Sequence, residues 1–394
     1  MRSSTRKALE AAACVAALAT GLAGAIATAG HAQIRDPIAV QAGREEKLNK
    51  RGAIAYYTRQ WDLSDLPDYK PEQQVSGVIR QWGSNYFRQS SLGKAWKDAF
   101  RRYEPGITFK DRLDTTLIAI PGLALGLSDV SPGRKITSDE LLMFQRLKDY
   151  HPTEISAVTG SLNVPGWNYA IGIWVNKSNP ITKLTVEQLD GIFGAQRSGA
   201  FRGVEWDTSV ARGPDKNIRY WKQLGVTGAC ADKPIHVYGY NLKYHIPITF
   251  ADRVMYGSMK WNENLTEFTN YKNADGTTQL EGQQTVDAVG NDPCGIGYAG
   301  MNSATPRVKA LAIAPRGTHD YVPLNLETLR SRAYPLYDEV YFYIDKAPGK
   351  PLDPKVKEFM RFILSRQGQE LVQKDGKYLP LTAAVVRAQL KKLD

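Results

Sequence analysis

The sequence contains little cysteine and little histidine, with three cysteines and five histidines among 394 residues. Such scattered histidines and so few cysteines argue against a zinc site, and we expect neither a metal nor a cofactor. Cys14 lies in an N-terminal apolar stretch, which leaves Cys230 and Cys294 as a pair. In an oxidising compartment this pair indicates one disulfide bond, and two buried free thiols are the alternative.

Long apolar runs are also missing, except for one within residues 1–32. This run follows Arg2, Arg6 and Lys7 and ends in small residues, which is the pattern of an export signal. We therefore predict a signal peptide over residues 1–32 and a cleaved, exported product, with a retained N-terminal anchor as the alternative. We expect no membrane span after it, because no second apolar run of about 20 residues follows.

No run of lysine and arginine is dense enough to indicate a nucleic-acid surface, and the aromatic residues are scattered. We therefore expect no nucleic-acid partner. The formal net charge is nevertheless +11, and a basic balance favours anionic partners in general.

The sequence lacks the short motifs of common enzymes, namely G-x-x-x-x-G-K-[ST], H-E-x-x-H and G-x-S-x-G. Residues 295–300 match the dinucleotide pattern G-x-G-x-x-G, but they lie in a strand-like run. Pro306 then follows where that motif needs a helix. We therefore predict a protein that is not an enzyme.

The roughly 360 residues after position 32 suit two domains better than one core. Residues 33–76 are polar and weakly periodic, and we interpret them as an arm around the first domain. From residue 77 on, strand-like and helix-like segments alternate, which predicts an α/β fold with a mostly parallel sheet. The expected strands include 78–82, 107–110, 127–130 and 339–344, and the expected helices include 141–147, 247–255 and 262–270.

Three of the predicted strands run into polar turns that are followed by a helix. These turns contain Ser84 and Asn85, Thr115 and Thr116, and Ser128 and Asp129. In an open α/β sheet such turns gather at the carboxyl ends of the strands, where ligands bind. Hydroxyl groups and helix N-terminal amides suit a tetrahedral oxyanion, and Asp129 can accept a hydrogen bond from a protonated oxygen. Three independent helix caps are the plainer alternative.

Several separate motifs occur in an order that is found in one family. They are Gly83 with Ser84, L-S-D-V at 127–130 followed by Gly133 and Arg134, N-P at 179–180, L-T-x-x-Q-L-x-x-I-F at 184–193, G-I-G-Y at 295–298, and the tail from P-G-K-P-L-D at 348–353 to Y-L-P-L at 378–381. On these motifs the sequence resembles the phosphate-binding receptors of bacterial ABC importers, in the periplasmic binding protein superfamily. The resemblance covers about residues 77–381.

The resemblance implies two α/β lobes, each with a mixed, mostly parallel sheet, joined by two hinge strands with a ligand cleft between them. It assigns residues 77–165 and 310–394 to a discontinuous lobe I and residues 166–309 to lobe II. It also implies a monomeric periplasmic receptor that binds phosphate or a related oxyanion and delivers it to a membrane ABC permease. The alternatives are a divergent receptor for another small organic or phosphorylated ligand, a signalling or partner-binding role and, less favoured, an exported hydrolase on the same scaffold.

The family's contacts imply ligand-binding roles in the first lobe for Ser84, Asn85, Tyr86, Thr115 or Thr116, Ser128 and Asp129. In the second lobe the family has an arginine after Tyr-Gly and then Ser-Gly-Thr, whereas this chain reads Y-G-Y-N-L-K-Y-H-I-P over 238–247. Without a bidentate cation, a doubly charged phosphate loses its strongest partner. Arg134, or Lys243 with His245, could substitute for that cation. Tyr240, Asn241 and Tyr244 could instead form a site for a less charged ligand.

Overall fold

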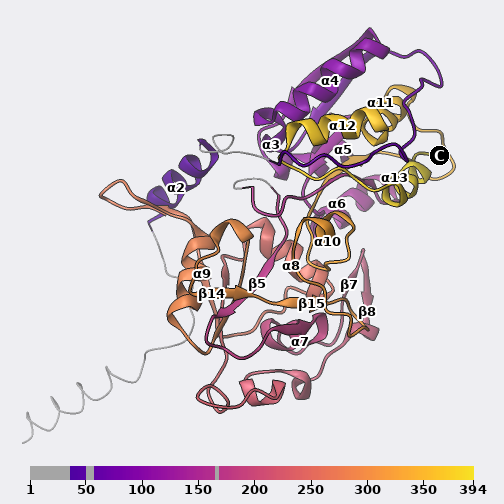
Figure 1. Cartoon of the computed structure of the whole chain (residues 1–394). Helices are drawn as coiled ribbons and strands as arrows, with labels where there is room; N and C mark the ends of the chain where they lie inside the picture. Colours follow the sequence, from indigo (N-terminus) through magenta and orange to yellow (C-terminus); the bar gives the residue numbers. More distant parts are fainter. Residues whose placement is uncertain (1–35, 50–56, 165–167) are drawn as a thin grey trace, which may run out of the picture.

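The computed structural model describes residues 36–49, 57–164 and 168–394, which form two α/β lobes and an N-terminal arm (Figure 1). Each lobe is built on a five-stranded mixed sheet, in the order β2-β1-β3-β16-β4 in lobe I and β10-β9-β13-β5-β14 in lobe II. The predicted two-lobed α/β fold is therefore confirmed. The predicted signal peptide and Cys14 lie outside the described residues. Within the described ranges, no helix is both long and apolar enough to cross a bilayer.

The sheet of lobe I directs three strand ends toward lobe II. Strand β1 (Ser76–Trp82) pairs in parallel with β2 (Gly106–Arg112) along its whole length and with β3 (Val130–Gly133) near its end. Strand β16 (Glu339–Ile344) runs antiparallel between β3 and β4 (Thr153–Thr159). The carboxyl ends of β1, β2 and β3 therefore share an edge with the start of β16.

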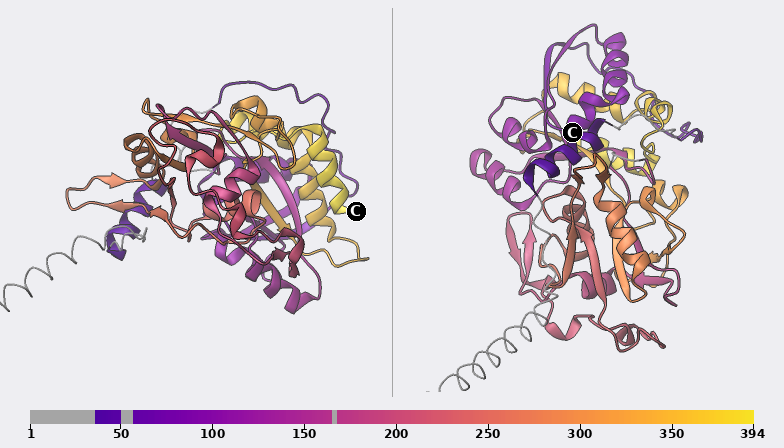
Figure 2. Two further views of the ribbon diagram at one scale, coloured as in Figure 1. Left: turned by 90° about the horizontal axis from the view of Figure 1, so that it is seen from below. Right: turned by 90° about the vertical axis from the view of Figure 1, so that its left-hand side faces the viewer.

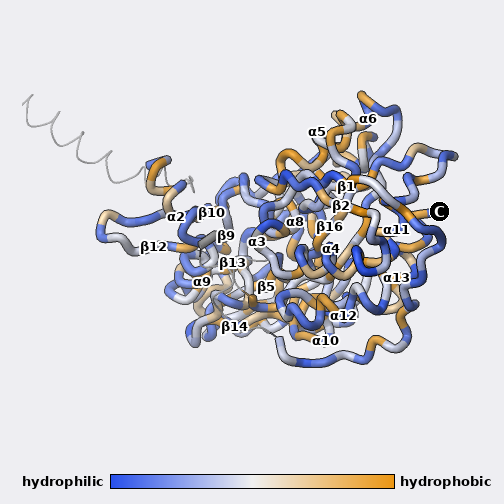
Figure 3. Tube along the Cα trace, turned by 90° about the horizontal axis from the view of Figure 1, so that it is seen from above, coloured by the Kyte–Doolittle hydropathy of each residue, from blue (hydrophilic) through white to orange (hydrophobic). Residues whose placement is uncertain are grey.

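Both faces of the lobe I sheet are covered, and the alternation along β16 shows how. Phe342 packs into the larger core, whereas Tyr341 and Tyr343 face the smaller one, since successive side chains of a strand point to opposite faces. Figure 3 shows the hydrophobic residues concentrated along the strands and the helices that face them. The larger core is closed by α4 (Ser91–Tyr103), α11 (Pro354–Leu364), α12 (Arg366–Asp375) and α13 (Ala383–Leu390), and the smaller by α5 (Ala119–Ala124) and α6 (Ser138–Lys148).

Lobe II surrounds its sheet with α7 (Val186–Phe193), α8 (His245–Met255) and α9 (Glu281–Asn291). Its core is aromatic: the rings of Phe250 and Tyr298 stack with centroids 4.8 Å apart. Cys230 and Cys294 are joined by a disulfide bond, the pairing expected from the sequence. Its strands are β5 (Gly172–Asn176), β9 (His236–Tyr240), β10 (Leu265–Phe268), β13 (Gly295–Ala299) and β14 (Val308–Ala310).

The chain returns from lobe II to lobe I later than expected. Leu311, Ile313 and Tyr334 belong to the lobe II core. In addition, β15 (Ala312–Ala314) pairs in parallel with β6 (Lys183–Thr185) of that lobe. The return therefore lies just before β16 and not at residue 310, because the segment between them buries its apolar side chains in lobe II.

The N-terminal arm contacts both lobes. Helix α2 (Pro37–Asn49) lies beside the hairpin formed by β11 (Tyr271–Lys272) and β12 (Thr278–Gln279) of lobe II, as Figure 1 and the left view of Figure 2 show. The segment after residue 57 instead runs over lobe I, where Leu63, Leu66 and Tyr69 are buried in the core.

Two local predictions were wrong. Residues 262–270, predicted as helix, contain strand β10, which pairs in parallel with β9. The predicted strand at 127–130 begins only at Val130 and continues to Gly133. In both cases pairing with neighbouring strands determines the secondary structure, because such short segments have only a weak intrinsic preference for helix or strand.

Candidate functional site

A cavity of about 270 Å³ lies between the lobes, where the strand ends of lobe I meet lobe II. Its lobe I wall comprises residues 84–87, 115–117, Gly133, Arg134 and Val340. Its lobe II wall comprises Asn168, Tyr169, Tyr240, residues 243–246, Ile248, Asn270 and Glu281, and the arm adds Arg44 and Lys47. Of these 22 residues, 16 have side chains that can donate or accept hydrogen bonds.

The turn after β1 is held close to β3. The amide of Ser84 donates to the carbonyl of Pro132 at 2.8 Å. Gly83 has a φ of 153°, and a Cβ there would lie 2.1 Å from the same carbonyl oxygen, so this position requires glycine. Ser84 then caps α3 (Asn85–Gln89), its hydroxyl accepting from the amide of Tyr86 at 3.2 Å. Ser84 and Tyr86 are thereby fixed at the cavity wall.

The turn after β2 repeats this arrangement. Thr115 caps the short helix η1 (Thr116–Ile118), and its hydroxyl accepts from the amide of Leu117 at 3.4 Å. Thr115, Thr116 and Leu117 all line the cavity. Two capped helix starts therefore bring hydroxyl and amide groups to the lobe I wall.

On the lobe II wall, α8 directs its N-terminus at the cavity. The cap residue Tyr244 makes no side-chain capping hydrogen bond, and Lys243, Tyr244 and His245 line the space. The first-turn amides and the positive end of the helix dipole therefore face the cavity. The end of this helix and Lys243 therefore contribute positive charge to the wall, although the family's arginine and Ser-Gly-Thr are missing here.

Two buried tyrosines form the floor on the lobe II side. The hydroxyl groups of Tyr169 and Tyr240 lie 3.1 Å apart, and both residues line the cavity. Burial raises the pKa of both phenols above the ordinary value. They therefore remain neutral groups that can donate a hydrogen bond.

Among the described residues that line the cavity, Glu281 at the start of α9 is the one that carries a carboxylate. Its side chain is only 4% exposed and pairs with Lys47 through Oε1. Its amide donates to the Oδ1 of Asn270 at 3.0 Å. The Oε2 atom is buried and has no hydrogen-bond partner among the described residues. A buried oxygen without a hydrogen-bond donor destabilises the folded protein. A ligand in the cavity that carries a donor could satisfy it.

Arg134 lies at the cavity, but its guanidinium is already engaged. It binds both carboxylate oxygens of Glu140, at 2.8 and 3.0 Å, and the carbonyl of Lys135. Because Glu140 occupies the guanidinium bidentately, it offsets the positive charge of Arg134 and uses the donors that would bind a ligand. Arg134 thus lies where the sequence suggested but is a weak substitute for the missing arginine.

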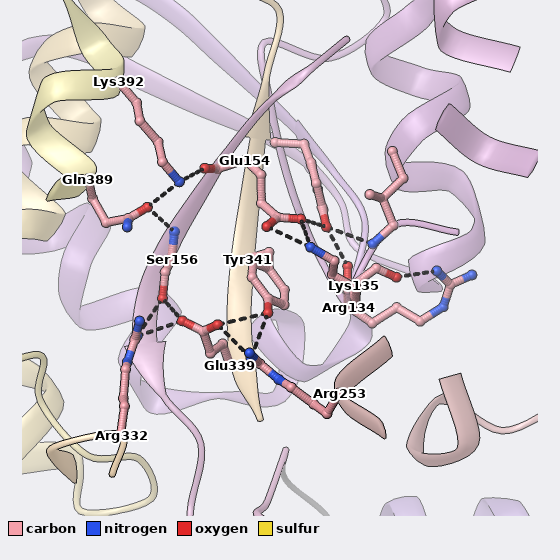
Figure 4. A network of polar contacts seen from close by, with 12 residues as sticks. Arg134, Lys135, Glu154, Ser156, Arg253, Arg332, Glu339, Tyr341, Gln389 and Lys392 are labelled. Carbon is pink, nitrogen blue, oxygen red and sulfur yellow. Dashed lines mark hydrogen bonds and ion pairs between the residues drawn. The ribbon is translucent and has the colours of Figure 1, made fainter. Parts of the chain in front are cut away.

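Below the cavity, one face of α8 is bound to the start of β16. His245, Thr249 and Arg253 follow one another at intervals of four residues and so share a helix face. His245 Nε2 lies 3.0 Å from Asp338 Oδ2, and Arg253 lies 3.0 Å from Glu339 Oε2. Figure 4 shows the second of these contacts within a wider polar network. These bonds join lobe II to the returning strand of lobe I.

Seven of the ten predicted ligand-binding residues line this cavity: Ser84, Asn85, Tyr86, Thr115, Thr116, Arg134 and Tyr240. Ser128, Asp129 and Asn241 do not. Ser128 bonds to the hydroxyl of Ser131 at 2.7 Å, and Asn241 accepts the amide of Lys243 in a turn.

Asp129 lies at the wrong end of its strand. It comes before β3, whereas the cavity is at the far end, at Gly133 and Arg134, about 13 Å away for four extended residues. Arg80 occupies both of its oxygens, with Nη2 2.6 Å from Oδ1 and Nε 3.1 Å from Oδ2. Although partial burial alone would raise it, the pKa of Asp129 is lowered by these hydrogen bonds. Asp129 is therefore a structural partner of β1.

Six further polar residues of the cavity were not predicted from the sequence: Glu281, Asn168, Tyr169, Asn270, Arg44 and Lys47. Only Glu281 carried a local signal, since an acidic residue at a helix start is favoured by the helix dipole. The others come together only when the lobes and the arm assemble.

Comparisons with known proteins identify the family of this chain. A family model described as "PBP superfamily domain" matches residues 84–367. The chain is 31% identical over 329 residues to the phosphate-binding protein PstS of Pseudomonas aeruginosa strain PAO1, covering 83% of this chain and 90% of that protein. It is 25% identical over 222 residues to the protein SphX of Synechococcus elongatus, covering 56% of each.

A solved structure, PstS from Borrelia burgdorferi, aligns with a TM-score of 0.49 at 17% identity, over 78% of this chain and all of that one. The sequence match to the family model and to PstS spans most of the chain. This chain belongs to the PBP superfamily, and within it to the family of PstS phosphate-binding proteins.

Proposed function

We propose that this protein is an exported, periplasmic receptor that binds phosphate, or a closely related tetrahedral oxyanion, between its lobes and delivers it to an ABC importer. The main support for this proposal is the cavity, which has a volume of about 270 Å³ and whose lining includes hydroxyl groups, amides and cations. This volume lies below the usual range for drug-sized ligands and suits a small ion with a few waters. Similarity to a PstS phosphate-binding protein supports phosphate as the ligand.

The two lobes offer complementary contacts to the anion. Lobe I presents the hydroxyls of Ser84 and Thr115, each at the start of a helix. Lobe II presents the N-terminus of α8 with Lys243 and the neutral hydroxyl groups of Tyr169 and Tyr240. Hydrogen bonds to a charged acceptor are stronger than neutral ones, so contacts from both lobes favour closure around the anion.

The carboxylate of Glu281 supplies selectivity. Glu281 lines the proposed anion site, and its Oε2 is buried without a hydrogen-bond partner among the described residues, so its carboxylate would repel a fully deprotonated anion. A proton on the ligand removes this conflict, because the protonated oxygen donates a hydrogen bond to Oε2. Phosphate and arsenate carry such a proton at neutral pH and sulfate does not. Glu281 thus takes the role that the sequence suggested for Asp129.

The same contacts support binding and not turnover. Ser84 accepts the amide of Tyr86 as a helix cap, and His245 is bonded to Asp338. The hydroxyl of Ser84 and the imidazole of His245 therefore have structural partners that fix them in place.

Isothermal titration calorimetry with inorganic phosphate, arsenate and sulfate tests the proposal. We expect phosphate and arsenate to bind and sulfate to bind at least about a hundredfold more weakly, since an unpaired buried carboxylate opposes it. The Ser84→Ala variant should bind phosphate about tenfold more weakly. Ser90→Ala is the matched control, because Ser90 also caps a helix, α4, but does not line the cavity.

A wild-type protein that shows no heat with any of the three anions contradicts the proposed ligand class. Equal phosphate affinities in the Ser84→Ala and Ser90→Ala variants contradict the assignment of the lobe I wall. Delivery to an importer is tested separately, by comparing phosphate uptake in cells that express or lack the protein. Unchanged uptake under phosphate limitation contradicts the transport role.

A further inference from the structure

Helix α2 is placed at the cavity by close contacts with lobe II. Gly43 packs against the backbone of β11, and a Cβ there would lie 2.6 Å from the Cα of Tyr271. Glu46, one turn further along, pairs with Lys272 at 3.4 Å and accepts a hydrogen bond from Thr278. The helix therefore has a defined seat on the β11–β12 hairpin, beside which Figures 1 and 2 show it.

Two cations of α2 reach the cavity from this seat. Lys47 binds the Oε1 of Glu281, and its own side chain is 22% exposed. An ammonium group has three donors, so those not used by Glu281 remain for an anion. Arg44 lies over the ring of Tyr244, with its guanidinium carbon 5.9 Å from the ring centroid. Among the described residues, Arg44 has no carboxylate partner.

The other cavity cations do not supply an equivalent group. Arg134 is bound to Glu140, and His245 is bonded to Asp338. Lys243 faces the cavity, but as a point charge it lacks the planar fork that binds two oxygens at once. Arg44 is therefore the arginine at this cavity, within the described part of the chain, that is not already held by a carboxylate.

We infer that α2 is a third wall of the ligand site, in which Arg44 provides a guanidinium that no carboxylate of the described residues holds and Lys47 provides ammonium donors. The inference rests on the proposed oxyanion-binding function. Helix α2 lies before the part of the chain that the family model matches, residues 84–367. Lys47 also ties α2 to lobe II at this site, because it pairs with the Oε1 of Glu281, which lines the cavity.

Three full-length variants test this role by calorimetry with inorganic phosphate at fixed ionic strength. Arg44→Gln removes the guanidinium, and we expect affinity to fall about tenfold or more, the usual effect of losing a charged hydrogen bond. Gly43→Val keeps both cations but forces α2 away from the backbone of Tyr271, so it should weaken binding similarly. Arg146→Gln is the control: this exposed arginine on α6 changes net charge equally but lies away from the cavity.

The outcomes separate the two proposals. If wild-type protein binds phosphate and the Arg44→Gln and Gly43→Val variants bind it equally well, the role of α2 is overturned and the proposed function stands. If Arg146→Gln weakens binding as much as Arg44→Gln, general electrostatic attraction accounts for the effect and the inference is also overturned. If wild-type protein binds no oxyanion, the proposed function itself fails. Melting temperatures of all variants exclude unfolding as the cause.

Discussion

The carboxylate of Glu339 at the start of β16 is bound from both lobes, and its removal is predicted to destabilise the protein. Arg332 lies 2.6 Å from its Oε1 and Arg253 lies 3.0 Å from its Oε2 (Figure 4). Tyr341 donates to Oε2 at 2.8 Å, and Ser156 donates to Oε1. The perturbation is Glu339→Gln, which keeps the shape of the side chain and removes its charge.

The expected loss follows from burial. The side chain of Glu339 is 7% exposed, and those of Arg253 and Arg332 are 19% and 14% exposed. Removing one partner of a buried ion pair costs about 3–5 kcal/mol, because it leaves uncompensated charge in a poorly solvated place. The amide still forms some hydrogen bonds, so we expect the free energy of unfolding to fall by about 3 kcal/mol. The melting temperature should fall by roughly 5–10 °C.

The pH dependence gives this prediction a second, independent signature. Burial alone would raise the pKa of Glu339, but Arg332 and Arg253 lower it overall, below its usual range. A carboxyl group whose pKa is lowered on folding stabilises the folded state. This stabilisation is fully present above the unfolded-state pKa of about 4.3 and is lost as the pH falls through the folded-state pKa. The Glu339→Gln variant lacks this group. The stability difference should therefore be constant from about pH 7 to pH 5 and shrink below about pH 4.

Urea unfolding followed by tryptophan fluorescence, repeated over this pH range, measures both quantities. Glu327→Gln is the matched control, because Glu327 also pairs with an arginine, Arg59, but both side chains are about half exposed. Such exposed pairs contribute about 0–1 kcal/mol. Equal losses in the two variants, or a difference for Glu339→Gln that does not shrink in acid, would refute this account of the network.

Three further predictions follow from other contacts. Asp129→Asn should leave phosphate affinity within about twofold in calorimetry but lower stability by about 1 kcal/mol, since the hydrogen bonds to β1 are weakened. Replacing Cys230 and Cys294 together by serine opens a loop of 64 residues and should lower the free energy of unfolding by up to about 4 kcal/mol in chemical denaturation. Glu281→Gln should reduce the preference for phosphate over sulfate at least about tenfold in competition titrations, because an amide can donate to an unprotonated oxyanion.

Those parts of the fold that depend on local chemistry were predictable from the sequence. The capping box of Thr137 and Glu140 starts α6 as expected, and Asp353 followed by a proline starts α11. The continuous run of β-branched and aromatic residues in β16 likewise identifies a buried strand. In each case neighbours in sequence are neighbours in space, so the pattern carries the information.

Asp129 shows where such patterns fail. A polar residue beside a strand gives no indication of which end of the strand it occupies, and a shift of three residues moved the predicted strand from 127–130 to Val130–Gly133. As a result, Asp129, which the predicted strand placed near its carboxyl end, lies before the start of β3, at the end away from the cavity. The error arose because a four-residue strand is defined by its pairing with β1 and β16, which the sequence does not show.

The missing arginine and Ser-Gly-Thr in the second lobe argue less strongly against an anion site than the sequence suggested. The amides at the start of α8 and the dipole of that helix come from the backbone, so they persist when the side chains of the motif change. A cationic side chain at the cavity, in turn, can come from any part of the sequence that folds against it. Lys47 meets Glu281 across 234 residues, because the arm and lobe II fold against each other. The absence of a motif therefore removes one set of donors, and only the assembled structure shows which other polar groups lie at the cavity.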